Sequence, residues 1–354
     1  MERAKQEKIN LWDAVATNKK KFRVKMCFAK DVGLGTCEGK IIKSHTISRS
    51  ANLDKIAKDG KVICYAHNLS ELKKNRESLL PKEIGIGVAS TFSGFCSKHD
   101  FQLFSCIETE PFVGRPEQCL AIAYRTLSRE LYGKIAAGHL RETLQDADKG
   151  KPLLTQFLFQ ELINNIYQAN DLANKELRAT YEKLIQALGK CRSNVLRSIV
   201  IEFDGTLPFM VAGAWSPLTD LFGNQLQKGF EDKNLEQIFI SSFWGQDCSK
   251  ICISWVDRPD APGKVIADQI CMLPQRQQVT ACLQLSVKHV ENIFYDPTWF
   301  RSLPKDQLNQ LNILAASGID IDGSVPTEQI NLKFDFALVG TTRISSSVGD
   351  DKES

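Results

Sequence analysis

The chain has 354 residues, which is enough for two or three domains of ordinary size. Hydrophobic residues make up 43% and charged residues 25% of it, the balance of a soluble globular protein. No apolar run approaches the roughly 18 residues that span a bilayer, and the charged N-terminus lacks the apolar core of a secretory signal. We therefore expect a cytoplasmic protein without a membrane partner.

The eleven cysteines are spread along the chain without a dense framework. Their number is odd, and no export signal accompanies them, so reduced thiols are expected rather than a disulfide scaffold. Most of them read as small buried hydrophobic residues. A few near the N-terminus have a spacing that suggests metal binding.

The first region, residues 1–110, is irregular and contains several glycines. Its patterns predict paired strands at 21–28 and 40–46, a helix at 50–58, and a second helix that begins within 68–83. Gly85, Gly87 and Gly94 then predict a loop that leads into Cys96.

Basic residues gather at the start of this region. The residues concerned are Lys19, Lys20, Lys21, Arg23, Lys25, Lys43 and Arg49. A basic surface binds phosphate backbones by releasing counterions, so we predict that these side chains contact nucleic acid. A solvated basic face with no partner is an equal alternative.

Four residues of the first region have the character of zinc ligands: Cys27, Cys37, Cys96 and His99. Thiolates and imidazole are the donors that tetrahedral zinc prefers, and a Cys-x2-His pair presents both side chains from one turn. Gly33 and Gly35 allow the chain to turn back between the first two cysteines. We predict one structural zinc ion here, with Cys64, Cys106 and His67 as spare candidates. The alternative is that these are unrelated buried thiols and a surface histidine.

The second region, residues 111–192, is predicted to be helical. Leucines recur at helical spacing from about residue 116 to 190, with a break at 148–152, which predicts a hairpin of two long helices. Their apolar faces could equally form a surface for a second copy or another protein, because periodicity does not distinguish the two.

The third region, residues 193–354, is β-rich. Predicted strands lie at 195–203, 209–214, 237–243, 251–256 and 280–287. An antiparallel sheet is the natural arrangement. Together the regions predict the α+β class: a zinc-stapled N-terminal module, a helical connector and a β-rich C-terminal domain.

The residues CEGKIIKSHTISRS from Cys37 to Ser50, followed later by GFCSKHD from Gly94 to Asp100, resemble the treble-clef zinc module of HNH-type endonucleases. The likeness covers residues 25–100. It implies that His45 matches the family's general base and that Asn52 lies near the place of its orienting asparagine. The segment between His45 and Cys96 is longer than in compact members of the family.

This resemblance implies a zinc-containing protein that acts on nucleic acid, with metal-dependent phosphodiester hydrolysis in microbial defence as its expected role. Neutral His45 would take a proton from water, and a second divalent ion such as magnesium would offset charge on the phosphate. The unplaced candidates for binding that ion are Asp54, Asp59, His67 and Asp100. A supporting role for His45 in the zinc hairpin is the alternative.

Two further interpretations compete with the nuclease hypothesis. In one, the zinc module is a non-catalytic scaffold, and the C-terminal β domain binds a protein or small ligand. In the other, His289 and Glu291 alternate on one strand face and form a hydrolase site. More often, such residues cap a strand end above packed aromatic rings. No phosphate-cradling glycine motif or HExxH motif is present.

Overall fold

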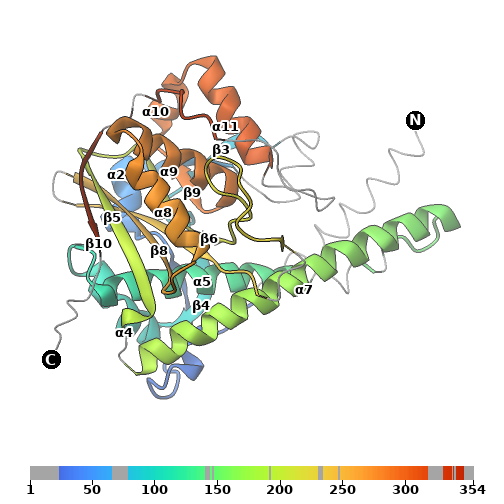
Figure 1. The fold of residues 1–354 in the computed structure, drawn as a ribbon. Helices are drawn as coiled ribbons and strands as arrows, with labels where there is room; N and C mark the ends of the chain where they lie inside the picture. Colours follow the sequence, from blue (N-terminus) through green and yellow to red (C-terminus); the bar gives the residue numbers. More distant parts are fainter. Residues whose placement is uncertain are drawn as a thin grey trace.

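The computed structural model describes most of the chain (Figure 1). The described residues are 24–65, 79–139, 144–145, 147–190, 193–229, 234–245, 248–317, 330–336, 338 and 340–346. They fold into helices and antiparallel strands, which confirms the predicted α+β class. None of the helices in these ranges has both the length and the apolar character needed to cross a membrane.

The N-terminal third contributes strands to two different sheets. Its elements are η1 (Phe28–Asp31), β1 (Ile41–His45), η2 (Arg49–Leu53), α2 (Asp54–Ile56), β2 (Lys61–Tyr65), β3 (Pro81–Gly85), β4 (Thr91–Cys96) and α4 (Ser97–Glu108). β1 and β4 form an antiparallel two-stranded sheet, in which Ile41 lies opposite Cys96 and His45 lies opposite Thr91. β2 and β3 instead form one edge of a large eight-stranded sheet.

The expected pairing of 21–28 with 40–46 is wrong, because the partner of β1 is β4. Residues 21–23 lie outside the described residues, 24–27 have no regular structure, and Phe28–Asp31 form a turn of 3-10 helix. Gly94, which suggested a loop, lies inside β4. A Cβ atom at this position would collide with the rings of Phe92 and Phe28, so glycine here allows close packing rather than a turn.

The two long helices predicted between residues 116 and 190 are confirmed as α5 (Pro116–Gly138) and α7 (Leu153–Gly189), which pack against each other. Pro116 is the first residue of α5, where a backbone N–H has no acceptor within the helix, so proline loses no hydrogen bond there. Figure 1 shows the first half of α7 extending beyond the rest of the protein. Large apolar side chains are exposed on its first two turns: Leu153, Leu154, Phe157 and Leu158. A protein partner or second copy on these helices stays a prediction.

The C-terminal part builds most of the eight-stranded antiparallel sheet, whose order is β10-β5-β8-β7-β6-β9-β2-β3. Its strands are β5 (Leu196–Asp204), β6 (Phe209–Trp215), β7 (Ile238–Trp244), β8 (Cys248–Val256), β9 (Ile293–Tyr295) and β10 (Thr341–Ser346), preceded by η3 (Ser193–Val195). The helices here are α8 (Pro262–Met272), α9 (Gln275–His289), α10 (Pro297–Ser302) and α11 (Lys305–Ser317). The first four predicted strands are therefore confirmed.

The fifth predicted strand, 280–287, is wrong, because these residues lie within α9. All residues from Gln278 to Lys288 are buried. The helix therefore lacks an exposed polar face, and its sequence does not show the 3.6-residue alternation of polar and apolar side chains that identifies a helix. His289 is the last residue of α9 and Glu291 lies in the following loop, so the two do not alternate on a strand.

Two large apolar clusters lie on the two sides of the sheet's central strands. One contains Phe203, Phe209 and Ile253 and packs α8, α9 and α11 onto the sheet. The other contains Phe28, Phe95 and Val200 and joins the β1–β4 sheet and the helices α4, α5 and α7 to β5 and β8. Both clusters include strands from the C-terminal part. Division of the chain at residues 110 and 192 into separately folding units stays a prediction.

Candidate metal centre

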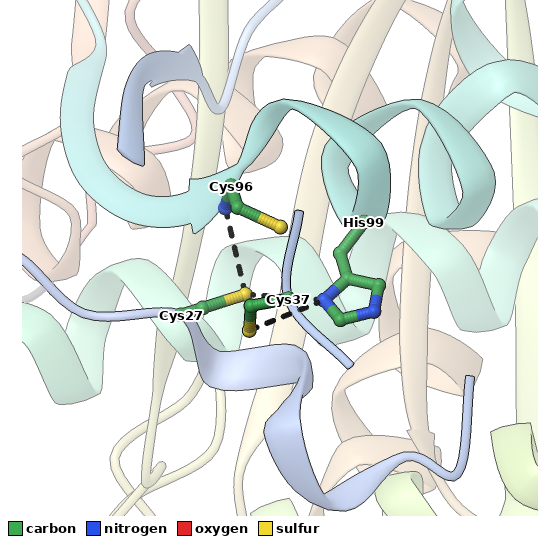
Figure 2. A group of neighbouring side chains, drawn as sticks. All are labelled: Cys27, Cys37, Cys96 and His99. Atoms are coloured by element: carbon green, nitrogen blue, oxygen red, sulfur yellow. Dashed lines mark hydrogen bonds between the residues drawn. The ribbon is translucent and has the colours of Figure 1, made fainter. Parts of the chain in front are cut away.

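Four predicted ligands, Cys27, Cys37, Cys96 and His99, come together at one end of the β1–β4 sheet (Figure 2). Cys27 immediately precedes η1 and Cys37 lies in the loop before β1. Cys96 is the last residue of β4, and His99 is in the first turn of α4. A strand that runs directly into a helix thus supplies two ligands at fixed spacing, while the preceding loop supplies the other two.

The distances within this cluster fit a tetrahedral zinc ion. The four ligand atoms lie within 4.8 Å of one another. The Sγ atom of Cys27 is 3.4 Å and that of Cys37 is 3.7 Å from Nδ1 of His99. With Zn–S bonds of about 2.3 Å and Zn–N bonds of about 2.0 Å, tetrahedral geometry places sulfur and nitrogen about 3.5 Å apart. Three thiols and one imidazole also have the donor chemistry of a structural zinc site. The residues present therefore fit zinc.

Glycines shape the loop that carries Cys37. Gly33, Gly35 and Gly39 have φ angles of 80°, 87° and 78°, in the left-handed region that only glycine adopts readily. The predicted turn between the first two cysteines is therefore confirmed. Lys98 then fastens this loop to α4: its Nζ is 2.6 Å from the Glu38 carboxylate and donates to the Thr36 carbonyl. The hydrogen bond from Lys98 holds the pKa of Glu38 below its usual value.

The segment next to Cys27 is anchored by two tyrosines that the sequence interpretation did not single out. Tyr124 of α5 donates its hydroxyl to the Phe28 carbonyl at 3.0 Å, and Tyr181 of α7 donates to the same oxygen. Both rings are buried. A buried tyrosine needs a partner for its hydroxyl group, and this need was the only signal in the sequence that could have identified them. The group of candidate ligands is therefore held in place by α5 and α7.

The electrostatic surroundings of the buried thiols differ. Burial raises the pKa of Cys27 to about 11. The backbone N–H of Cys96 donates to the Cys27 sulfur at 3.4 Å and acts in the opposite direction, lowering this pKa. Burial also acts to raise the pKa of Cys96, but backbone hydrogen bonds from His99 and Glu38 outweigh it, and the net shift is downward. Zinc binding requires thiolates, and the N–H donors that stabilise them are already in place.

A buried arginine contacts α4, the helix that carries His99. Arg125 of α5 is 1% exposed and its Nη2 atom is 2.7 Å from the carboxylate of Glu108 and 3.5 Å from that of Asp100, the residue after His99. Its guanidinium also lies 4.4 Å from the centre of the Phe104 ring. Arg125 thus ties both ends of α4 to α5, a role that the amphipathic pattern of α5 did not indicate.

His45, the predicted general base, is half-buried at the end of β1. Its Nε2 atom is 3.3 Å from the Ile86 carbonyl oxygen. A carbonyl only accepts hydrogen bonds, so Nε2 carries the proton and Nδ1 is the basic nitrogen. Burial lowers the pKa of His45, and the positive charges of Arg125 and Arg49 lower it further. The imidazole is therefore neutral at neutral pH.

Asn52, the predicted orienting residue, makes a structural contact. Its side-chain oxygen accepts the backbone N–H of Trp244 at 2.8 Å, and Asn52 is 4% exposed. Lys55 lies over the ring of the same tryptophan, 4.3 Å from its centre. These contacts fasten η2 and α2 to the end of β7, and they occupy the Asn52 oxygen.

The predicted nucleic-acid contacts are only partly described. Lys19, Lys20, Lys21 and Arg23 lie outside the described residues. Lys25, Lys43 and Arg49 are all exposed, and Arg49 is near enough to influence His45. Their role in binding nucleic acid stays a prediction.

Other candidates for metal binding do not join a second cluster. Within the described ranges, Cys27, Cys37, Cys96 and His99 form the only group of three or more histidine, cysteine or acidic side chains placed to hold an ion. Cys64 lies in β2 and Cys106 in the second half of α4, away from this group. Asp54 and Asp59 are exposed, Asp100 faces Arg125, and His67 lies outside the described residues.

Comparisons with known proteins do not assign the chain to a family: no family model, curated protein or solved structure matches it.

Proposed function

We propose that the β1–β4–α4 unit is a zinc-stapled, HNH-like module that acts on nucleic acid, with His45 as the general base for phosphodiester hydrolysis. The observation that carries the proposal is the shared position of His45 and the metal ligands on one small unit. His45 ends β1, the strand paired with β4, and β4 ends at Cys96. A metal that holds Cys96 and His99 would therefore fix the sheet that carries His45.

The state of His45 supports this role. A general base must be neutral and must have a free nitrogen lone pair. The Ile86 carbonyl holds the proton on Nε2 and leaves Nδ1 as the acceptor. Because burial, Arg125 and Arg49 lower its pKa, the base stays unprotonated at neutral pH. Arg49 is exposed and could also bind a phosphate oxygen close to this histidine.

The cofactors have separate tasks in this proposal. When bound by the cysteines and His99, zinc would be structural, because all four coordination positions are filled by protein. A second divalent ion such as magnesium would have to be held largely by water and the substrate phosphate, as magnesium commonly is. The described residues offer no separate cluster for it.

The second candidate is a non-catalytic zinc scaffold, and one observation favours it. Asn52 uses its side-chain oxygen to bind the Trp244 backbone, so this residue serves the packing of the module against the large sheet. In this hypothesis the zinc ion stabilises a surface, and the C-terminal part of the protein binds the ligand.

Cleavage of a supercoiled plasmid, single-stranded DNA and RNA with added magnesium distinguishes the two candidates. For zinc-loaded protein we expect cleavage that His45→Ala reduces by about 100-fold or more, the usual contribution of a general base. Zinc content and thermal stability should not change. His139→Ala is the matched control, because His139 is exposed at the end of α5. The scaffold hypothesis is supported instead if zinc-loaded wild-type protein cleaves none of the three substrates.

A further inference from the structure

The four candidate metal ligands differ in how far solvent reaches them. Cys37 is exposed, whereas Cys27 is 5% exposed and both Cys96 and His99 are 0% exposed. Figure 2 shows the four side chains converging from separate segments of the backbone. A small reagent in solution therefore meets Cys37 before any other donor of the cluster.

The backbone that carries Cys37 is also the part of the cluster with the most freedom to move. Residues 33–40 are all exposed, and the loop is fastened to α4 by the contacts of Lys98 with the Glu38 carboxylate and the Thr36 carbonyl. Ion pairs at the surface, such as that of Lys98 with Glu38, contribute little to stability. The loop can therefore shift while the apolar core under the β1–β4 sheet stays intact.

Cys27 is the thiol best placed to react with Cys37. Their sulfurs lie within 4.8 Å of each other and contact the same atom, Nδ1 of His99. A disulfide requires a sulfur–sulfur distance of about 2.05 Å and a suitable dihedral angle. Cys27 belongs to a stretch without regular structure and can adjust to these demands, whereas Cys96 is fixed opposite Ile41 in the β1–β4 pairing.

A second pair of thiols in the same chain shows why proximity is not sufficient. The Sγ atoms of Cys119 in α5 and Cys252 in β8 are 3.8 Å apart. These two residues are only 1% and 2% exposed and lie inside the second apolar cluster. Oxidation of a thiol depends on its access to the oxidant, so this buried pair provides an internal comparison for the exposed one.

We propose that Cys37 is an oxidation site for hydrogen peroxide and related small peroxides, and that its oxidation joins it to Cys27 in a disulfide and releases the metal. The proposal rests on zinc binding by the cluster, which is part of the proposed function. It does not depend on phosphodiester hydrolysis by His45.

The chemistry takes two steps, and both begin with a thiolate, the form in which a zinc-bound cysteine is held. The Cys37 sulfur attacks one oxygen of the peroxide: an S–O bond forms, the O–O bond breaks, and the hydroxide that leaves takes up a proton. The Cys27 sulfur then attacks the sulfenic sulfur of Cys37: the S–S bond forms, the S–O bond breaks, and a second hydroxide leaves and is protonated. Two thiolates thus lose two electrons, and hydrogen peroxide with two protons becomes two water molecules. Only Cys96 and His99 then remain as donors, too few to hold a structural zinc ion.

Treatment of the zinc-loaded full chain with hydrogen peroxide tests this assignment. A chromophoric zinc chelator in the buffer should report release of the ion, and peptide mass spectrometry without reductant should find the Cys27–Cys37 link. Cys119 and Cys252 should remain reduced. Dithiothreitol with added zinc should restore the metal content, because a disulfide is reversible.

The zinc content of the untreated protein separates two ways of failing. A wild-type chain without zinc overturns the metal site and this proposal together. Bound zinc that peroxide does not release overturns this proposal alone, and so does a disulfide between Cys119 and Cys252 in place of the Cys27–Cys37 link.

A substitution and a chemical trap locate the reactive sulfur. Cys37→His removes the exposed thiol but leaves two thiolates and two imidazoles, which is also a structural zinc set, and peroxide should release its zinc at least about ten-fold more slowly. Cys106→Ser is the matched control, because Cys106 is a half-buried thiol outside the cluster, and it should release zinc as the wild type does. Dimedone, which traps sulfenic acids, should label Cys37 in the wild type and gives an answer even if Cys37→His holds no zinc. Label on Cys27 or Cys96 instead, or equal release from Cys37→His and the wild type, would refute the site.

Discussion

The two sheets of this protein differ in the side chains that gather at them. The β1–β4 sheet has two strands, and four ligand atoms at its end come from segments as far apart as Cys27 and His99. The eight-stranded sheet has no such cluster among its described residues, and on one face apolar side chains from six of its strands pack against the helices α8 to α11. Both sheets have apolar packing, because Phe92 and Phe95 of β4 belong to the second apolar cluster, but within the described residues only the β1–β4 sheet also carries candidate zinc ligands.

This difference predicts different responses to substitution. Substitution of one ligand should abolish tight zinc binding, because three donors cannot hold the ion in the closed four-ligand geometry. Loss of one core side chain leaves a cavity, but its neighbours keep most of their contacts.

Cys96→Ala should release the metal and destabilise the β1–β4 sheet by several kcal/mol, since a structural zinc ion contributes roughly 10 kcal/mol to a small zinc domain. Elemental analysis should find about one zinc per wild-type chain and none in the variant. Amide hydrogen exchange should increase in β1 and β4 more than in β7 and β8. Cys106→Ala is the control, because Cys106 is a half-buried thiol of α4 outside the cluster. Unchanged zinc content in Cys96→Ala would contradict the assigned ligands.

Phe203→Ala should lower the free energy of unfolding by about 3–5 kcal/mol, because the ring is fully buried in the core of the large sheet. Zinc content should stay the same, in contrast to the ligand variant. Phe222→Ala makes the same chemical change at a side chain that is 58% exposed, and it should cost less than about 0.5 kcal/mol. Chemical denaturation measures both. Similar losses in the two variants would show that the core is not where the structure places it.

His289 gives the smallest effect, a pH dependence of stability. Burial lowers its pKa in the folded protein to about 3, whereas an unfolded histidine binds a proton near pH 6.5. The unfolded chain thus binds more protons between these values, and stability falls as pH falls. One group contributes at most about 1.4 kcal/mol per pH unit. Urea titrations from pH 7 to pH 5 should show that the free energy of unfolding falls less steeply with pH in His289→Gln than in wild type. His139→Gln should show the same pH dependence as wild type.

The candidate metal site shows which structural features can be predicted from residue type and spacing alone. Cys96 and His99 are three positions apart, so one turn at the start of a helix brings them together whatever the rest of the chain does. The glycines near Cys37 likewise encode a local turn. The four ligands could be chosen for these reasons, and the structure places them together.

The α+β class, the two long helices and four strands of the large sheet could be predicted from the sequence, because each depends on local periodicity. The four candidate metal ligands could be chosen from donor type and from the close spacing within each pair, and the structure brings the two pairs together. The tertiary structure alone decided the rest. In it β1 pairs with β4 and not with the preceding segment, and the buried residues 280–287 form part of a helix. The side-chain oxygen of Asn52 accepts a hydrogen bond from the Trp244 backbone. These features depend on contacts between residues far apart in the chain, and a residue that is buried on all sides carries no periodic signal of the partner that buries it.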